Sequence, residues 1–147
     1  MFGVLLFGLT VEALVAAFLM AGSVNLANLL DLRPGRAMKF LAAPLLVLLF
    51  LAPQASVLVV IGIVGGAVGL FYFDLKGRIM LGDAGAAVYG SVLGYLVVMS
   101  GPGPVWWVAG AAILGLTVLA EISSISRVIR EVEILRRFDS WGRSGDE

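Results

Sequence analysis

The chain has 147 residues, of which 61% are hydrophobic and 14% are charged, and its mean hydropathy is +1.05. A soluble globular domain is about 45–50% apolar and about 25% charged, so this composition excludes an ordinary soluble domain and a disordered chain. The absence of cysteine and histidine excludes disulfides, thiolate chemistry and imidazole acid–base catalysis. Ten basic and ten acidic residues give no net charge, which argues against a nucleic-acid partner. We therefore expect an integral membrane protein.

The first apolar stretch, residues 2–24, contains one charged residue, Glu12, and predicts a membrane-spanning helix. Glu12 falls near the middle of this span, about 20 Å along a helix from Asn25. Ionisable residues in a membrane are functional candidates. This position is too deep for a site at the membrane surface, so we favour a structural contact with another helix. The uncharged start near Met1 does not resemble a signal peptide, and we expect an upstream portion of a longer membrane protein.

Two longer uncharged runs follow, residues 40–73 and 84–120. Each would be about 50 Å long as one helix, against a hydrocarbon core of about 30 Å, so each must fold back on itself. Pro53 divides the first run, and the Gly-Pro-Gly-Pro sequence at 101–104 divides the second. The sequence therefore predicts an all-α membrane protein with about five transmembrane helices, a lone first helix followed by two hairpins.

Small residues four apart within these runs predict close helix packing rather than chemistry. The pairs are Gly62/Gly66, Gly65/Gly69 and Gly90/Gly94.

The basic residues predict the orientation of the helices. They occur in three segments only, which are Arg33, Arg36 and Lys39; Lys76 and Arg78; and Arg127, Arg130, Arg136, Arg137 and Arg143. In a five-span chain these three segments share one side, which the positive-inside rule assigns to the cytoplasm. The N-terminus is then outside and the C-terminus is cytoplasmic.

The tail differs from the rest of the chain. We divide the chain into a transmembrane domain, residues 1–120, and a cytoplasmic segment, residues 121–147. Within residues 121–138, apolar side chains recur every three or four positions with arginines between them, which predicts an amphipathic helix. The apolar positions are Ile122, Ile125, Val128, Val132, Leu135 and Phe138. Such a helix either lies on the anionic inner leaflet or docks on the cytoplasmic loops of its own chain.

The first cytoplasmic loop contains Asn25, Asn28 and Asp31, three residues apart and therefore along one face of a helix end. Asparagine is a poor helix former and is costly in lipid, so its use here needs a reason. One reason is chemistry at the membrane surface. The other is helix termination, with polar residues at the interface followed by Pro34 and Gly35.

The second loop places Asp83 between Gly82 and Gly85, directly before an apolar helix. A carboxylate in this position either caps the helix or holds Mg²⁺ against a diphosphate, and glycines let a ligand approach the backbone. Lys76 and Arg78 either contact phosphates or only mark the inner side of the membrane. Because both loops lie on the same side, they are expected to converge on one site suited to a magnesium–diphosphate substrate.

These motifs resemble those of the polyprenyl-phosphate N-acetylhexosamine-1-phosphate transferases, which include phospho-N-acetylmuramoyl-pentapeptide transferase. Members carry a cytoplasmic Asn-x-x-Asn-x-x-Asp element, and later a Phe-x-Phe stretch that leads into Met-Gly-Asp-x-Gly. The present chain has Asn-Leu-Ala-Asn-Leu-Leu-Asp at 25–31, Phe-Tyr-Phe at 71–73 and Leu-Gly-Asp-Ala-Gly at 81–85. The order, the side of the membrane and the intervening hairpin agree, and the resemblance covers residues 2–120.

The resemblance implies an Mg²⁺-dependent enzyme of cell-wall biogenesis in the bacterial plasma membrane. It would transfer a sugar-1-phosphate from a UDP-N-acetylhexosamine to a polyprenyl phosphate and release UMP. The implied metal ligand is Asp83, which with Asp31 would form the catalytic pair. Asn25 and Asn28 would line the nucleotide and metal pocket with the Gly82 and Gly85 backbone. Lys76 and Arg78 are our own candidates for phosphate contacts.

The chain also departs from the family pattern. Members have two adjacent aspartates in an earlier loop, and no such pair occurs here; Ala84 and Ala86 stand where members have Thr and Ser. The chain therefore resembles the C-terminal half of such an enzyme. The alternative to an active transferase is a non-catalytic homologue or half-subunit that scaffolds or regulates an envelope-synthesis partner. Its missing partner would be an N-terminal half or a second copy.

Overall fold

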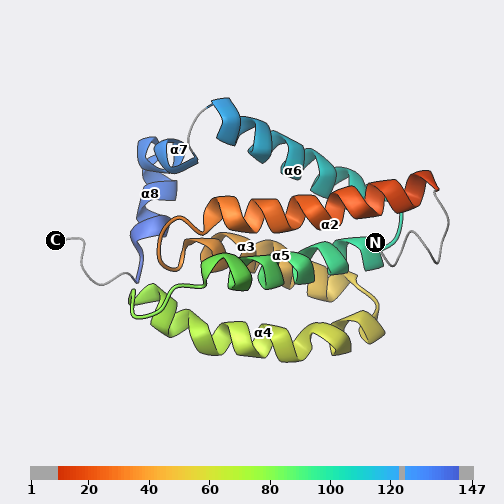
Figure 1. Ribbon diagram of the computed structural model, residues 1–147, viewed down its shortest axis with the longest axis horizontal. Helices are drawn as coiled ribbons and strands as arrows, with labels where there is room; N and C mark the ends of the chain where they lie inside the picture. Colours follow the sequence, from red (N-terminus) through yellow and green to blue (C-terminus); the bar gives the residue numbers. More distant parts are fainter. Residues whose placement is uncertain (1–9, 123–124, 143–147) are drawn as a thin grey trace.

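The computed structural model describes residues 10–122 and 125–142. The described residues form seven helices and no strand, which confirms the predicted all-α class (Figure 1). The helices are α2 (Val11–Leu30), α3 (Arg36–Leu51), α4 (Gln54–Leu75), α5 (Gly82–Met99), α6 (Pro104–Ile122), α7 (Ile125–Glu131) and α8 (Glu133–Ser140).

Helix α2 begins later and ends later than the predicted span of residues 2–24. Thr10 is its N-cap, and the Thr10 hydroxyl accepts the N–H of Ala13 at 3.2 Å, which sets the start of the helix. Glu12 consequently lies exposed in the first turn, where the helix dipole favours an acid, and not near the middle of a span. No hydrogen bond or ion pair joins Glu12 to another helix among the described residues, and a contact with a helix outside them, such as a missing span, stays a prediction. The part of the predicted span at 2–9 lies outside the described residues.

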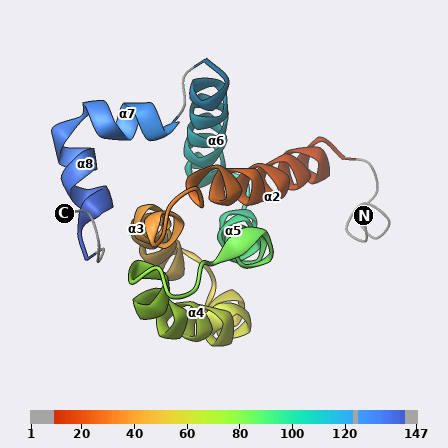
Figure 2. The same cartoon turned by 60° about the vertical axis from the view of Figure 1, so that its left-hand side comes forward.

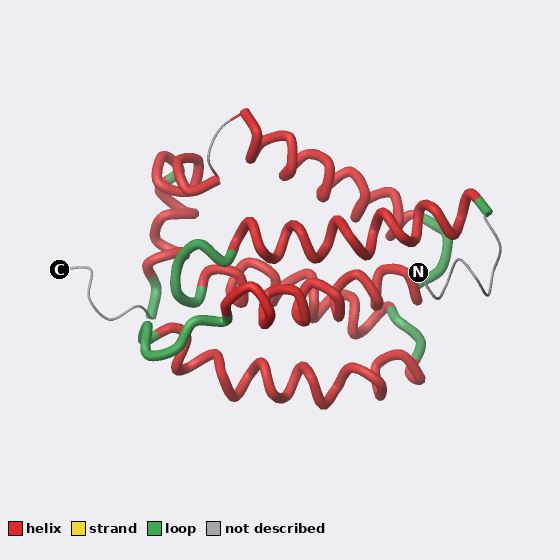
Figure 3. Tube along the Cα trace, in the orientation of Figure 1, coloured by secondary structure: helices red, strands yellow, loops and turns green. Residues whose placement is uncertain are grey.

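Both predicted hairpins are present. Pro53 is the N-cap of α4, directly after α3 ends. At the second break Gly101 adopts a left-handed φ of 80°, which favours glycine. Across this turn the Trp106 indole N–H donates to the carbonyl of Val97 at 2.9 Å. The helices therefore run back and forth, and their connections lie at the two ends of the bundle (Figure 3).

Helix α5 is central and contacts α2, α3, α4 and α6. Its Gly90 and Gly94 face the backbone of α2, and a Cβ added at Gly90 would lie 2.7 Å from the carbonyl oxygen of Ser23. The predicted packing role of this pair is confirmed. The glycines of α4, by contrast, face no described atom within 4 Å, so the same prediction for that helix is wrong within the described residues. These glycines are Gly62, Gly65, Gly66 and Gly69.

The predicted tail helix is two short helices, because Val132 is extended (φ −91°, ψ 110°) and separates α7 from α8 (Figure 2). Side chains at 121–125 lie outside the described ones. All the basic segments that the structure describes lie at one end of the bundle, where the α2–α3 and α4–α5 connections meet α7 and α8 (Figure 1). We call this the loop end.

Helices α2 and α5 are long and apolar enough to cross a membrane, by length and composition. Two further apolar segments are shorter, Val60–Leu75 and Pro104–Ala120. Helix α3 begins with Arg36 and Lys39, and its apolar part after Lys39 is about 18 Å long, short of a hydrocarbon core of about 30 Å. The described residues thus contain two candidate spans, where the sequence predicted five.

Candidate functional site

The end of α2 carries the first predicted motif. Asn25 and Asn28 lie on the exposed face of the helix, while Ser23 and Leu26 are buried against its neighbours. Asp31 is the C-cap, and its N–H donates to the carbonyls of Ala27 and Asn28 at 3.1 and 3.2 Å. The Asp31 side chain is half-buried. The two amides therefore point away from the core, and only the aspartate turns toward the other loop.

A second carboxylate lies behind the first. Asp74, in the last turn of α4, is 2% exposed, and its Oδ2 accepts the N–H of Gly35 at 3.1 Å. Gly35 has a φ of 71°, and a Cβ there would lie 2.6 Å from Leu75 Cδ2. Glycine at position 35 therefore allows the α2–α3 loop to close onto the end of α4. Asp74 is the next-to-last residue of the apolar segment of α4 and lies at the loop end.

The third carboxylate, Asp83, lies exposed in the first turn of α5. The N-cap is Leu81, which supplies no side-chain cap, so Asp83 does not take the capping role that was the alternative for this motif. Gly82 has a φ of 67° and open space around its Cα, whereas Gly85 packs against the side chain of Leu81. Only the first of these two glycines leaves the backbone open to a ligand.

Asp31 lies close enough to both other carboxylates to respond to their charge. Burial raises the pKa of Asp31, and the nearby charges of Asp74 and Asp83 raise it further, while the backbone of Gly82 opposes the shift. Burial also raises the pKa of Asp74, against the backbone groups of Gly35 and Leu81 and the charge of Lys39. The ends of α4 and α5 therefore both lie near Asp31, and a shared binding site formed by the two loops stays a prediction.

Two oxygens in this cluster are buried without a hydrogen-bond partner among the described residues: Asp31 Oδ1 and Asp74 Oδ1. The described residues contain no group of three or more acidic, histidine or cysteine side chains that could hold a metal ion. Mg²⁺ commonly takes only one or two protein carboxylates and completes its shell with phosphates and water. The donor set therefore fits Mg²⁺ that arrives with a phosphate, and does not fit an all-protein metal cage.

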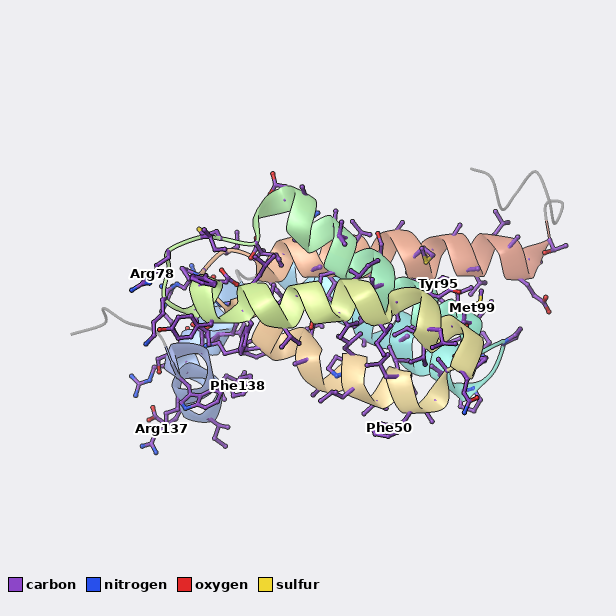
Figure 4. All side chains as sticks on the ribbon, turned by 90° about the horizontal axis from the view of Figure 1, so that it is seen from below. Phe50, Arg78, Tyr95, Met99, Arg137 and Phe138 are labelled. Atoms are coloured by element: carbon purple, nitrogen blue, oxygen red, sulfur yellow. The ribbon has the colours of Figure 1, made fainter. Side chains whose placement is uncertain are left out.

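The two predicted cations, Lys76 and Arg78, are exposed, and no hydrogen bond or ion pair joins either to the carboxylates among the described residues. Figure 4 shows Arg78 at the loop end. Their contact with a phosphate stays a prediction. The cation whose charge acts on Asp74 is Lys39. Arg36 and Lys39 are both buried and bind the tail. From the sequence, both residues were interpreted only as markers of the inner side of the membrane.

An apolar cavity of about 750 Å³ runs along the bundle between α2, α3 and α6 and ends under α7 and α8. Its walls include Leu30 of α2 and Phe40 of α3, and none of the three carboxylates lines it. Ser23 is the one polar side chain among the described residues of the lining, and its hydroxyl donates to the carbonyl of Leu19 at 2.8 Å. The described lining is therefore almost entirely apolar.

Comparison of the chain with known protein families, curated proteins and solved structures gives no match. The site rests on its own geometry. Asp74 was not predicted as a site residue, although it is a charged residue directly after the uncharged run of residues 40–73, which is a signal for a role at that position. The pairing of Arg36 with Asp139 was not predicted either, because no local sequence pattern indicates it.

Proposed function

We propose that the chain is a membrane-embedded sugar-1-phosphate transferase, or the half of one that carries the metal-binding loops. It would act on a UDP-N-acetylhexosamine and a polyprenyl phosphate in cell-envelope synthesis. The observation that carries the proposal is the convergence of Asp31, Asp74 and Asp83 at the loop end, with two buried carboxylate oxygens that no described group satisfies. This is a site for a cation bound to a diphosphate at a membrane surface.

In the proposed reaction an oxygen of the polyprenyl phosphate attacks the β-phosphorus of the UDP-sugar. A new phosphoanhydride bond forms, the bond to the α–β bridging oxygen breaks, and UMP leaves. Bound Mg²⁺ would neutralise charge that develops on the phosphates. Asp83 and Asp31 would hold the metal, and Asp74 would add negative charge behind them. The open backbone at Gly82, at the start of α5, would face a phosphate, since helix N-termini favour anions.

We place this site on the cytoplasmic face of a bacterial plasma membrane, in a five-helix arrangement with the N-terminus outside. Large apolar side chains that point outward support lipid as the surrounding solvent, among them Phe50 at 89% and Trp107 at 80% exposed. The clustering of basic segments at the loop end supports the orientation. The apolar cavity between α2, α3 and α6, whose walls include Leu30 at the end of α2, would receive the acceptor's polyprenyl chain.

The test is UMP release from membranes that contain this chain, UDP-N-acetylhexosamine, polyprenyl phosphate and Mg²⁺. We expect Asp83→Asn and Asp31→Asn to lower turnover by at least about 100-fold, because each removes charge opposite the transferred phosphate. Glu131→Gln removes an exposed acid of α7 and should leave turnover unchanged. Equal turnover in wild type and Asp83→Asn would refute the assignment.

One observation favours the alternative of a half-subunit. Asn25 and Asn28 lie on the exposed face of α2, so the pocket that they would line is not closed by the described residues. A second polypeptide packed on this face would complete it. In that case the chain alone releases no UMP, and co-expression with a segment that carries paired aspartates restores turnover that depends on Asp83.

A further inference from the structure

The first residue of α3 is an arginine with no solvent exposure, bound to the C-terminal tail. Arg36 Nε lies 2.7 Å from Asp139 Oδ1, and Arg36 Nη2 lies 3.0 Å from Asp139 Oδ2. The remaining terminal nitrogen donates to the hydroxyl of Ser126 at 2.8 Å. Such a bidentate pair fixes both distance and orientation. Arg36 thus joins α3 to α8 through Asp139 and to α7 through Ser126.

Lys39, one turn further along α3, binds the end of α8. Its ammonium group donates to the backbone carbonyls of Phe138 and Trp141, both at 3.1 Å, and to that of Asp139. These carbonyls lie at the C-terminus of a helix, where a cation is favoured. The rings of Phe40 and Phe138 add an edge-to-face contact with centroids 5.3 Å apart. The tail is therefore held at the start of α3 by polar and aromatic contacts together.

The peptide next to this attachment is part of the carboxylate cluster. Gly35, directly before Arg36, donates its N–H to Asp74 Oδ2. A glycine with a left-handed φ has little conformational restraint of its own, so its orientation depends on what its neighbours hold. The tail holds one neighbour rigidly, and Asp74 is held in turn through the Gly35 N–H.

We propose that the tail is a clasp that positions the carboxylate cluster, with Arg36, Lys39 and Asp139 as positioning residues. The clasp fixes the α2–α3 loop so that the Gly35 N–H stays on Asp74 and Asp31 stays beside it. The claim that the clasp holds the Gly35 N–H on Asp74, which is the geometric part of the proposal, does not depend on the proposed function. The claim that the clasp affects turnover rests on that function.

The geometric part is tested by hydrogen exchange of the Gly35 amide in the full chain, in lipid nanodiscs, resolved by mass spectrometry of the 30–40 segment. We expect Asp139→Asn to speed exchange at Gly35 by about 10-fold or more. Asp139→Glu keeps the carboxylate and should restore most of the protection, and the matched control Glu131→Gln should not change it. Exchange at Gly35 in folded Asp139→Asn within twofold of wild type would overturn the proposal.

Two further variants separate positioning from general loss of structure. Asp74→Ala, which removes the acceptor of the Gly35 N–H, combined with Asp139→Asn should expose Gly35 no more than either change alone, because both break one path of contacts. Additive effects would overturn the proposal. If Asp139→Asn does not fold, Ser126→Ala removes only the 2.8 Å contact and should give a smaller increase in exchange at Gly35. No increase in that variant counts against the clasp.

The activity arm measures the Mg²⁺ concentration for half-maximal UMP release. We expect it to rise in Asp139→Asn and to recover in Asp139→Glu. If wild type releases no UMP alone or with a co-expressed segment that carries paired aspartates, the proposed function fails, and exchange at Gly35 still decides whether the clasp exists.

Discussion

The contact between α2 and α5 gives the sharpest test of the fold, because the two helices are so close at Gly90 that no side chain fits there. A Cβ at Gly90 would lie 2.7 Å from both the Ser23 carbonyl oxygen and Val24 Cα, and 3.0 Å from Ala27 Cβ. Two of these three atoms belong to the backbone, so no rotation of a side chain relieves the clash. In Gly90→Ala the two helices must separate by roughly 0.7 Å to regain ordinary contact distances.

The magnitude follows from a matched control. Gly66→Ala adds the same methyl group to α4, where no described atom lies within 4 Å. Each substitution gains about 1 kcal/mol of helix propensity, so the difference between the two variants isolates the cost of the clash. Overpacking costs about 1–3 kcal/mol, and the backbone contacts place Gly90→Ala at the upper end. A difference of about 3 kcal/mol corresponds to a Tm difference of about 6–12 °C.

Wild type, Gly66→Ala and Gly90→Ala are heated in the same detergent, and the fraction that remains folded at each temperature is measured by size-exclusion chromatography. We expect Gly66→Ala at or slightly above the Tm of wild type and Gly90→Ala clearly below it. Since α2 carries Asp31 and α5 carries Asp83, Gly90→Ala should also weaken Mg²⁺-dependent UMP release in protein that remains folded. Equal Tm values for the two variants would show that α2 and α5 do not pack as described, and the geometry of the site would fall with them.

Two other predictions concern the loop end. Burial raises the pKa of Asp31 and Asp74, so the folded chain binds protons at a higher pH than the unfolded chain. In chelator, stability should therefore be greatest in acid and fall as the pH rises from about 4, the usual aspartate pKa, through the raised values, and Asp74→Asn should flatten the Tm-against-pH curve over this range. A Tm that rises with pH in this range, equally in both proteins, contradicts the burial of these acids. The exposed side of the tail presents Ile134 and Trp141 beside Arg137, and we expect it to contact anionic lipid. In a variant with Trp106 and Trp107 replaced by Phe, the fluorescence of Trp141 should be quenched by anionic lipid that carries a shallow nitroxide label. Quenching by aqueous iodide alone would place this side of the tail in water.

Features set by local sequence could be predicted. Pro53 and the Gly-Pro-Gly-Pro sequence break the helices wherever the chain folds, because they remove backbone donors or add conformational freedom. The meeting of the basic segments at one end followed from the number of helices between them. The position of Asp31 beside the start of α5 followed from the same reasoning, and its coupling to Asp83 agrees with it.

Features that depend on contacts between residues far apart in the sequence could not be predicted. Asp74 is buried because Gly35, 39 residues away, closes onto it. Arg36 and Asp139 are 103 residues apart, so nothing in either neighbourhood predicts their pairing. The sequence left two alternatives for the tail, a lipid surface or the cytoplasmic loops of its own chain. In the structure one face of the tail docks on α3 through Asp139, and the other face is exposed. The glycine pairs show the same limit, since one spacing packs tightly in α5 and meets no described atom in α4.

The buried charges at the loop end fall into two kinds, and the difference argues for a working site. Arg36 is paired with a carboxylate in bidentate geometry, which is how a buried charge serves structure. Asp31 and Asp74 each keep one buried oxygen without a described partner, and each raises the cost of ionising the cluster. If Asp74 only joined Gly35 to α4, asparagine would accept the same N–H without a charge to desolvate. Retaining the acid therefore costs stability in the folded chain, and a bound cation of the kind that the proposed function needs would offset that cost.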